Sequence, residues 1–147
     1  MIQIRKFKAT IDDIKSYFIE NDEIFFEPMQ SRLDITKFSE KIYQNADQYW
    51  VINDEKKIGF MAIYFNHPTK KFGYITTISI IKEFQGTGLG KRLLEEAKFN
   101  ATENGFKKIR LQVHSHNIIA QNLYTKFGFE MIENDGLNRL MSISITR

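Results

Sequence analysis

A strand–helix–strand pattern in the middle of the chain limits the fold more than any other feature of the sequence. Residues 72–81 and residues 107–114 each have the apolar character of a strand. The apolar residues between them recur at helical spacing: Leu89, Leu93, Leu94, Ala97 and Ala101. Asn104-Gly105 then ends the helix. Strands joined through a helix in this way lie parallel, with a right-handed crossover, so an α/β fold is expected.

Shorter helices and strands surround this unit. Thr10 is expected to cap a helix over residues 11–19, and Ser31 or Asp34 to start a second helix that ends near Ala46. A third helix is expected over residues 117–127. Five further segments read as strands: residues 2–7, 49–53, 57–65, 129–133 and 140–145. Turns at residues 54–56 and 134–136 join hairpins, so the sheet is mixed, with the order β-α-α-β-β-β-α-β-α-β-β.

Composition favours one soluble domain over residues 1–147. Hydrophobic residues make up 42% of the chain, which is enough for a core, and there are 0 cysteines to form disulfides or thiolate metal sites. No apolar run approaches the roughly 20 residues of a membrane span, and no signal peptide is recognised, so a cytoplasmic location is expected. The net charge of +3 is dispersed along the sequence, which does not favour nucleic-acid binding. No spacing of His, Asp or Glu indicates a metal site.

A glycine cluster lies between the strand at residues 72–81 and the helix that follows it. It reads Gln85-Gly86-Thr87-Gly88-Leu89-Gly90-Lys91. Free backbone N–H groups at a helix N-terminus attract anions, and glycines let the backbone approach a phosphate closely. A tight turn without function explains the glycines equally well. The spacing excludes a P-loop, because Gln85 and Arg92 stand where glycine and Ser or Thr are required. Lys91 likewise stands where a dinucleotide-binding fingerprint needs its third glycine.

Gln85-Gly86-Thr87-Gly88-Leu89-Gly90 does match the motif Gln/Arg-x-x-Gly-x-Gly/Ala. Here the chain resembles the GCN5-related N-acetyltransferase (GNAT) family. The resemblance implies a mixed, centrally splayed sheet flanked by helices, and backbone amides that hold the pyrophosphate of coenzyme A. It also implies that Ile78, Ser79 and Ile80, on the strand before the loop, hold the pantetheine arm and the acetyl carbonyl. Lys91 either adds charge to this site or faces solvent.

A second motif strengthens the resemblance. The family pattern of Asn, Ala three residues on, Leu-Tyr and Gly-Phe is matched between Asn117 and Phe129. Asn117 is a natural N-cap, and Tyr124 lies two turns further along the same helix face. The resemblance implies that Asn117 helps to bind acetyl-CoA and that Tyr124 is the general acid for the departing thiolate. A half-buried core tyrosine is the alternative for Tyr124.

The expected reaction is direct attack of a primary amine on acetyl-CoA. Many relatives have Glu on the strand five residues before the motif asparagine, but this chain has Gln112, which is not a base at neutral pH. His114 shares the strand face of Gln112 and is one candidate base. A water chain, or an amine that arrives neutral, is the alternative.

The amine itself is not identified by the sequence. Phe25, Phe26 and Glu27 combine aromatic rings with a carboxylate and are candidates for binding an amine of a small molecule or a peptide, although core packing explains the aromatics as well. Strands within residues 129–145 offer an edge for a homodimer. A non-catalytic acyl-CoA-binding or sensing module is the alternative function, since the strand glutamate is missing.

Overall fold

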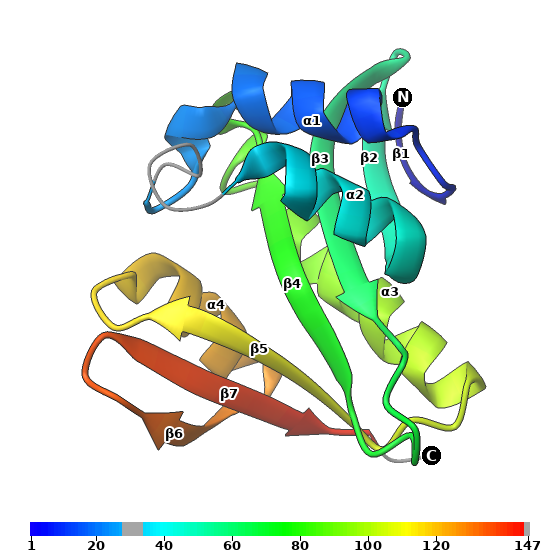
Figure 1. The fold of residues 1–147 in the computed structure, drawn as a ribbon. Coiled ribbons are helices and arrows are strands. Elements are labelled where there is room, and N and C mark those ends of the chain that lie inside the picture. Colours follow the sequence, from blue (N-terminus) through cyan, green and yellow to red (C-terminus); the bar gives the residue numbers. More distant parts are fainter. Residues whose placement is uncertain (28–33, 146–147) are drawn as a thin grey trace. The chain divides into compact units, whose positions relative to one another are not determined.

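The computed structural model describes residues 1–27 and 34–145 and contains seven strands and four α-helices in the predicted order (Figure 1). The strands are β1 (Ile2–Lys6), β2 (Asp47–Asn53), β3 (Lys56–Tyr64), β4 (Gly73–Ile80), β5 (Lys108–His114), β6 (Glu130–Asn134) and β7 (Asn138–Ser144). The helices are α1 (Ile11–Glu20), α2 (Ile35–Asn45), α3 (Leu89–Glu103) and α4 (Ile118–Phe127). Within the described residues there are also two 3-10 turns, η1 (Asp22–Ile24) and η3 (Lys82–Phe84).

The strands form one sheet in the order β1-β2-β3-β4-β5-β7-β6. β4 and β5 are parallel, with Gly73 opposite Ile109 and Ile75 opposite Leu111, as expected for strands joined by a helix. β5 and β7 are antiparallel, as are β6 and β7. The mixed α/β class predicted from the sequence is therefore confirmed.

By internal contacts the chain divides into two units, Met1–Ala62 with Thr77–Leu89, and Ile63–Thr76 with Gly90–Arg147. The chain passes from one unit to the other within β3, within β4 and at the start of α3. Each unit has its own buried side chains.

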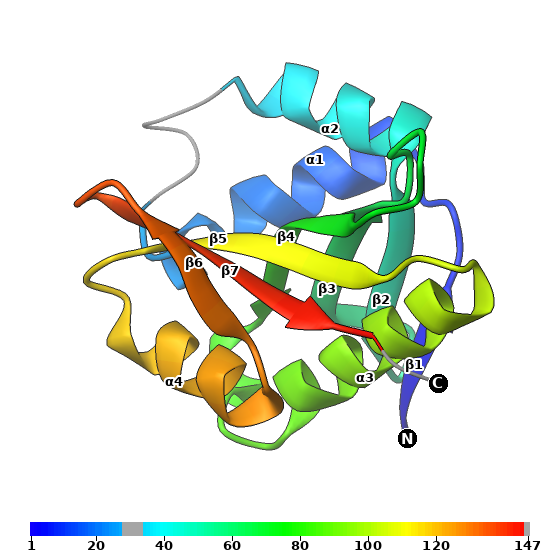
Figure 2. The ribbon, with the colours of Figure 1, turned by 90° about the horizontal axis from the view of Figure 1, so that it is seen from below.

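The first unit is built on an aromatic core. α1 and α2 lie side by side (Figures 1 and 2) and α1 buries Tyr17 and Phe18. Trp50 of β2 and Phe60 of β3 stack with ring centroids 4.0 Å apart, and both rings are 0% exposed. Such aromatic pairs contribute about 0.5–1.5 kcal/mol beyond the burial of their area. The core therefore fixes how α1 faces the strands of this unit.

The helix starts in the first unit follow the predicted capping. The Thr10 hydroxyl accepts a hydrogen bond from Asp13 N at 3.1 Å, and the Asp34 carboxylate accepts one from Lys37 N at 3.1 Å. Ser31, the other candidate for the start of α2, lies outside the described residues. The predicted turn over residues 54–56 is shorter than expected, because Asp54 and Glu55 alone take left-handed φ angles and Lys56 already belongs to β3.

In the second unit, α3 and α4 lie side by side (Figure 2), and α3 buries Leu93, Leu94, Ala97 and Ala101 as the helical spacing predicted. β7 begins at Asn138, two residues before the predicted strand. The Asp135 carboxylate explains this, because it accepts hydrogen bonds from Leu137 N and Asn138 N and ends the turn there. No helix in the described part of the chain is long and apolar enough to cross a membrane.

Candidate active site

The glycine loop, residues 85–88, runs directly into α3. The Gln85 side chain donates from Nε2 to the carbonyl oxygen of Ile80 at 3.0 Å and so ties the loop to the end of β4. The Thr87 hydroxyl donates to the carbonyl oxygen of Phe84. These two hydrogen bonds fix the conformation of the loop, and residues 86–88 are exposed to solvent.

Two glycines of this loop have the left-handed conformation that favours glycine. Gly86 has a φ of 76° and Gly88 a φ of 84°, and no atom lies within 4 Å of a Cβ built on either residue. Within the described residues, the N–H groups of Gly86, Thr87 and Gly88 have no backbone acceptor. A curled, exposed backbone with free donors before a helix N-terminus fits an anionic pyrophosphate.

The last three residues of β4 differ from the rest of the strand. Buried and half-buried residues alternate from Gly73 to Thr77, whereas Ile78, Ser79 and Ile80 are all half-buried. The Ser79 hydroxyl forms a hydrogen bond of 2.9 Å with the Tyr17 hydroxyl of α1. This segment is therefore partly accessible to solvent, and its polar side chain, Ser79, is hydrogen-bonded to Tyr17 of α1.

α4 carries the residues of the second motif. Asn117 is its N-cap and accepts a hydrogen bond from Ala120 N at 3.2 Å, as predicted. Tyr124 is 8% exposed and packs against Phe129, with ring centroids 5.9 Å apart. Burial raises the pKa of Tyr124 to about 12, so its phenol stays protonated at neutral pH. Among the described residues its hydroxyl has no hydrogen-bond partner.

A family model described as the acetyltransferase (GNAT) family matches residues 11–129, which includes both motifs. The chain belongs to this family. Residues 11–129 cover α1, the glycine loop and α4, so the match extends over both units.

Two GNAT relatives resemble parts of the chain. GCN5-related N-acetyltransferase 6, chloroplastic, of Arabidopsis thaliana is 31% identical over 65 residues, 44% of this chain and 23% of that protein. N-acetyltransferase YhfO of Bacillus subtilis is 37% identical over 76 residues, 50% of this chain and 51% of that protein. The chain spans about a quarter and about half of these relatives.

A solved structure extends the likeness to the whole chain. The PaiA N-acetyltransferase of Thermoplasma acidophilum, in complex with coenzyme A, has a TM-score of 0.78 and 21% identity, and the match covers 98% of this chain and 99% of that one. At this identity the likeness establishes the shared fold.

His114, the candidate base of this GNAT chain, accepts a hydrogen bond at one of its ring nitrogens. Its Nδ1 accepts a hydrogen bond from the backbone N–H of His116 at 3.1 Å. With Nδ1 as the acceptor, the neutral ring carries its proton on Nε2. The bond to His116 must break before His114 can act as a base. Gln112, which stands at the position of the common family glutamate, is exposed on β5.

A polar pair that no sequence pattern indicated, the buried Gln121 and the half-buried Arg139, holds the β5–α4 turn. Gln121 is 8% exposed, and its Nε2 donates to the carbonyl oxygens of His114 at 3.0 Å and Ser115 at 2.8 Å. Its Oε1 accepts a hydrogen bond from Arg139 of β7. Gln121 lies one turn beyond Asn117 on α4, but Arg139 is 18 residues further along the chain, so no local pattern reveals the pair.

Replacing Gln121 by leucine is expected to lower the free energy of unfolding by about 1–3 kcal/mol, because the guanidinium of Arg139 and two turn carbonyls lose their partner. Urea denaturation followed by circular dichroism measures the change. Asn122→Leu, at the exposed neighbouring position, is the control and should stay within about 0.5 kcal/mol of the unchanged protein. Equal effects of the two changes would show that Gln121 has no such role.

The acceptor-binding candidates divide into packed and exposed residues. Phe25 lies edge-on against Phe18 of the first-unit core, with ring centroids 5.9 Å apart. Phe26 is 51% exposed, and Glu27 is exposed too. Phe25 therefore contributes to packing, while the two residues after it face solvent.

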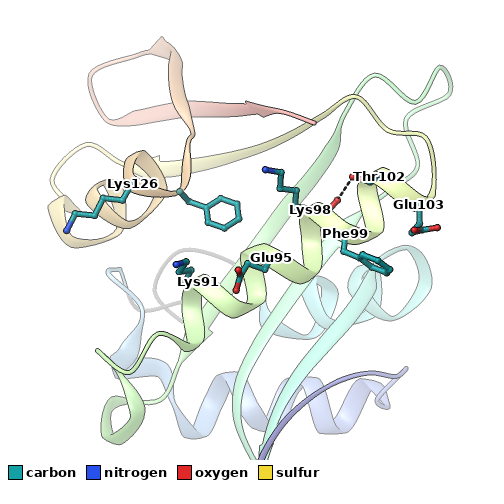
Figure 3. Close-up of a pocket in the computed structure, with 8 residues that line it drawn as sticks. Lys91, Glu95, Lys98, Phe99, Thr102, Glu103 and Lys126 are labelled. Carbon is teal, nitrogen blue, oxygen red and sulfur yellow. Dashed lines mark hydrogen bonds between the residues drawn. The ribbon is translucent and has the colours of Figure 1, made fainter. Parts of the chain in front are cut away.

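A groove of about 580 Å³ lies between α3 and α4 in the second unit (Figure 3). Lys91, Lys98 and Lys126 line it together with Glu95 and Glu103. Lys91, which was expected either to add charge to the coenzyme site or to face solvent, is exposed on this groove. Among the described residues, no group of three or more His, Asp or Glu side chains is arranged to hold a metal ion.

Proposed function

We propose that this chain is an acetyl-CoA-dependent N-acetyltransferase, in which a primary amine attacks the acetyl group directly within a ternary complex. The observation that carries the proposal is the open glycine loop before α3, in a GNAT chain whose α4 also carries the cap and the tyrosine of the second motif. We further propose that both units act together as one catalytic domain, because the family match includes parts of each.

The donor site is assigned to backbone and side-chain groups of three segments. The glycine-loop amides and the first turn of α3 bind the pyrophosphate, and the end of β4 binds the pantetheine arm and the acetyl carbonyl. The half-buried state of that strand end supports this role. The residues concerned are Ile78, Ser79, Ile80, Gln85, Gly86, Thr87, Gly88, Leu89, Gly90, Lys91, Asn117 and Tyr124.

Tyr124 is assigned to the departing thiolate. Its phenol is protonated at neutral pH because burial raises its pKa to about 12, and the hydroxyl has no competing partner among the described residues. An ordinary thiol has a pKa of about 8.5, well below the pKa of this phenol, so full proton transfer from Tyr124 to the thiolate is unfavourable. Tyr124 therefore acts mainly by donating a hydrogen bond to the sulfur as the C–S bond breaks.

The acceptor amine must be neutral when it attacks. Nδ1 of His114 accepts a hydrogen bond and Nε2 carries the ring proton. We therefore do not assign His114 as the base that takes the proton from the amine. The proton leaves to water, or the amine binds already neutral. Phe26 and Glu27 are proposed to contact the amine-bearing molecule, a small molecule or a peptide, because both are exposed on the first unit. The strands within residues 129–145 are proposed to offer the edge through which two copies of the chain form a homodimer.

Calorimetric titration of the purified chain with acetyl-CoA tests the donor site, with coenzyme A, ATP and NAD as controls. We expect micromolar binding of the two coenzyme A compounds alone. If ATP binds with the same affinity as acetyl-CoA, the glycine loop is a general phosphate-binding site and is not specific for coenzyme A. Tight acetyl-CoA binding without transfer to any primary amine would favour the alternative, a non-catalytic acyl-CoA-binding module, for which Gln112 in place of glutamate is the argument.

A further inference from the structure

A pair of hydroxyl groups joins α1 to the end of β4. The Tyr17 hydroxyl lies 2.9 Å from the Ser79 hydroxyl, although the two residues are 62 positions apart in the sequence. The Tyr17 ring is held edge-on against Trp50 at 5.3 Å and Phe60 at 5.9 Å, and it is 3% exposed. The phenol therefore has one fixed position, and that position places its oxygen at Ser79.

The direction of this hydrogen bond follows from the acidity of the two groups. Either hydroxyl can donate at this distance, and because a phenol is a stronger acid than an alkyl alcohol, the arrangement in which Tyr17 donates and Ser79 accepts is the favoured one. Burial raises the pKa of Tyr17 above its ordinary value, which keeps the donor proton in place over the whole working pH range. Ser79 keeps its own hydrogen, and a hydroxyl that accepts one hydrogen bond becomes a better donor of the next.

Ser79 also has the right location for a group that faces the substrate. It is the middle residue of the half-buried segment Ile78–Ile80, to which the proposed function assigns the acetyl carbonyl. A serine hydroxyl is separated from its own backbone N–H by two carbon atoms. An acyl oxygen bound at that N–H therefore lies within reach of the hydroxyl. Among the described residues, the Ser79 hydroxyl forms its hydrogen bond with Tyr17.

We propose that the Ser79 hydroxyl is a second hydrogen-bond donor to the acetyl carbonyl oxygen, beside the backbone of β4, and that Tyr17 is the positioning residue that holds and polarises it. As the amine forms the C–N bond, negative charge develops on that oxygen and strengthens the bond from Ser79. The carbonyl re-forms when the C–S bond breaks. Ser79 and Tyr17 keep their protons throughout.

This inference rests on the proposed function, and the experiment separates the two. The unchanged protein is first assayed for release of coenzyme A from acetyl-CoA with spermidine, glucosamine, lysine and an alanine-terminated peptide as acceptors. Absence of transfer there would count against the proposed enzyme as a whole and so overturn the role of Ser79 as well. With an accepted amine found, kcat and the acetyl-CoA dissociation constant are measured for Ser79→Ala, Tyr17→Phe and the double variant.

Ser79→Ala is expected to lower kcat about 10- to 100-fold, the usual effect of losing a hydrogen bond to a charged group, with acetyl-CoA affinity within twofold. Tyr17→Phe should lower kcat less, and it should have no further effect in the Ser79→Ala background, since Tyr17 acts through Ser79. Ser79→Thr keeps a hydroxyl and should retain most of the activity. Ser39→Ala removes a buried hydroxyl of α2 that has no hydrogen-bond partner among the described residues, and this control should behave as the unchanged protein.

Other outcomes overturn the proposal. If kcat of Ser79→Ala stays within twofold of the value for the unchanged protein, the hydrogen bond to Ser79 serves only to give the buried Tyr17 hydroxyl a partner. A loss of acetyl-CoA affinity that equals the loss of kcat would assign Ser79 to ground-state binding. Independent, additive effects of the two changes would remove the link through Tyr17. If circular dichroism shows that Ser79→Ala does not fold, Tyr17→Phe and Ser79→Thr decide by the same criteria.

Discussion

Replacing Gly88 by valine is expected to raise the acetyl-CoA dissociation constant at least 100-fold while the protein stays folded. A valine side chain here projects into open space, because no protein atom lies within 4 Å of a Cβ at this position. It would instead occupy the volume in which the pyrophosphate meets the loop amides. Two hydrogen bonds to a charged group, at about 1.5–3 kcal/mol each, account for a loss of this size. Calorimetry with acetyl-CoA measures it.

Gly136 supplies a matched control for backbone strain. Its φ of 92° is close to the 84° of Gly88, and it too has no atom within 4 Å of a built Cβ. A β-branched residue costs about 1–2 kcal/mol in a left-handed conformation. Gly136→Val should therefore lower the melting temperature as much as Gly88→Val does, with unchanged acetyl-CoA affinity. Loss of affinity in both variants would trace the effect to general destabilisation.

Replacing Tyr124 by phenylalanine is expected to lower kcat about 100-fold, because a hydrogen bond to the developing thiolate, worth about 1.5–3 kcal/mol, is lost. Acetyl-CoA affinity should change little, because the ring still packs against Phe129. The melting temperature should also hold, since the hydroxyl has no hydrogen-bond partner within the described residues. Steady-state kinetics with an accepted amine measure the loss.

Tyr43→Phe is the control for the loss of a tyrosine hydroxyl. Tyr43 lies on α2, where its ring stacks under the Lys8 ammonium at 4.2 Å, and phenylalanine keeps that contact. Turnover should stay at the level of the unchanged protein. A turnover of Tyr124→Phe that matches the control would remove the hydroxyl from the chemistry and favour a packing role for Tyr124.

Local features of the fold and site were predictable because their partners are close in the sequence. The Thr10, Asp34 and Asn117 caps each bond an amide three residues on, so a side chain followed by a helical pattern is enough to find them. The parallel orientation of β4 and β5 follows from their connection through a helix. Element ends were predicted to within one or two residues, including the start of β7, which the turn at Asp135 places two residues before the predicted strand.

Contacts between distant residues were not predictable in the same way. The sequence shows a tyrosine in α1 and a serine in β4, but 62 positions separate them and no short pattern connects them. The same holds for Gln121 and Arg139. For His114, the strand pattern indicated which face it shares, whereas the backbone turn at His116 decided that its Nδ1 is occupied.

The sequence by itself determined the element order, the parallel β4–β5 pair, the exposed glycine loop and the membership of the GNAT family. These follow from periodicity, capping and motif spacing, which act over a few residues at a time. Only the tertiary structure decided which hydroxyl holds Ser79, which lone pair of His114 is occupied and how far burial raises the pKa of Tyr124. Each depends on atoms that distant segments bring to within hydrogen-bond or packing distance, and such distances are set when the core is packed.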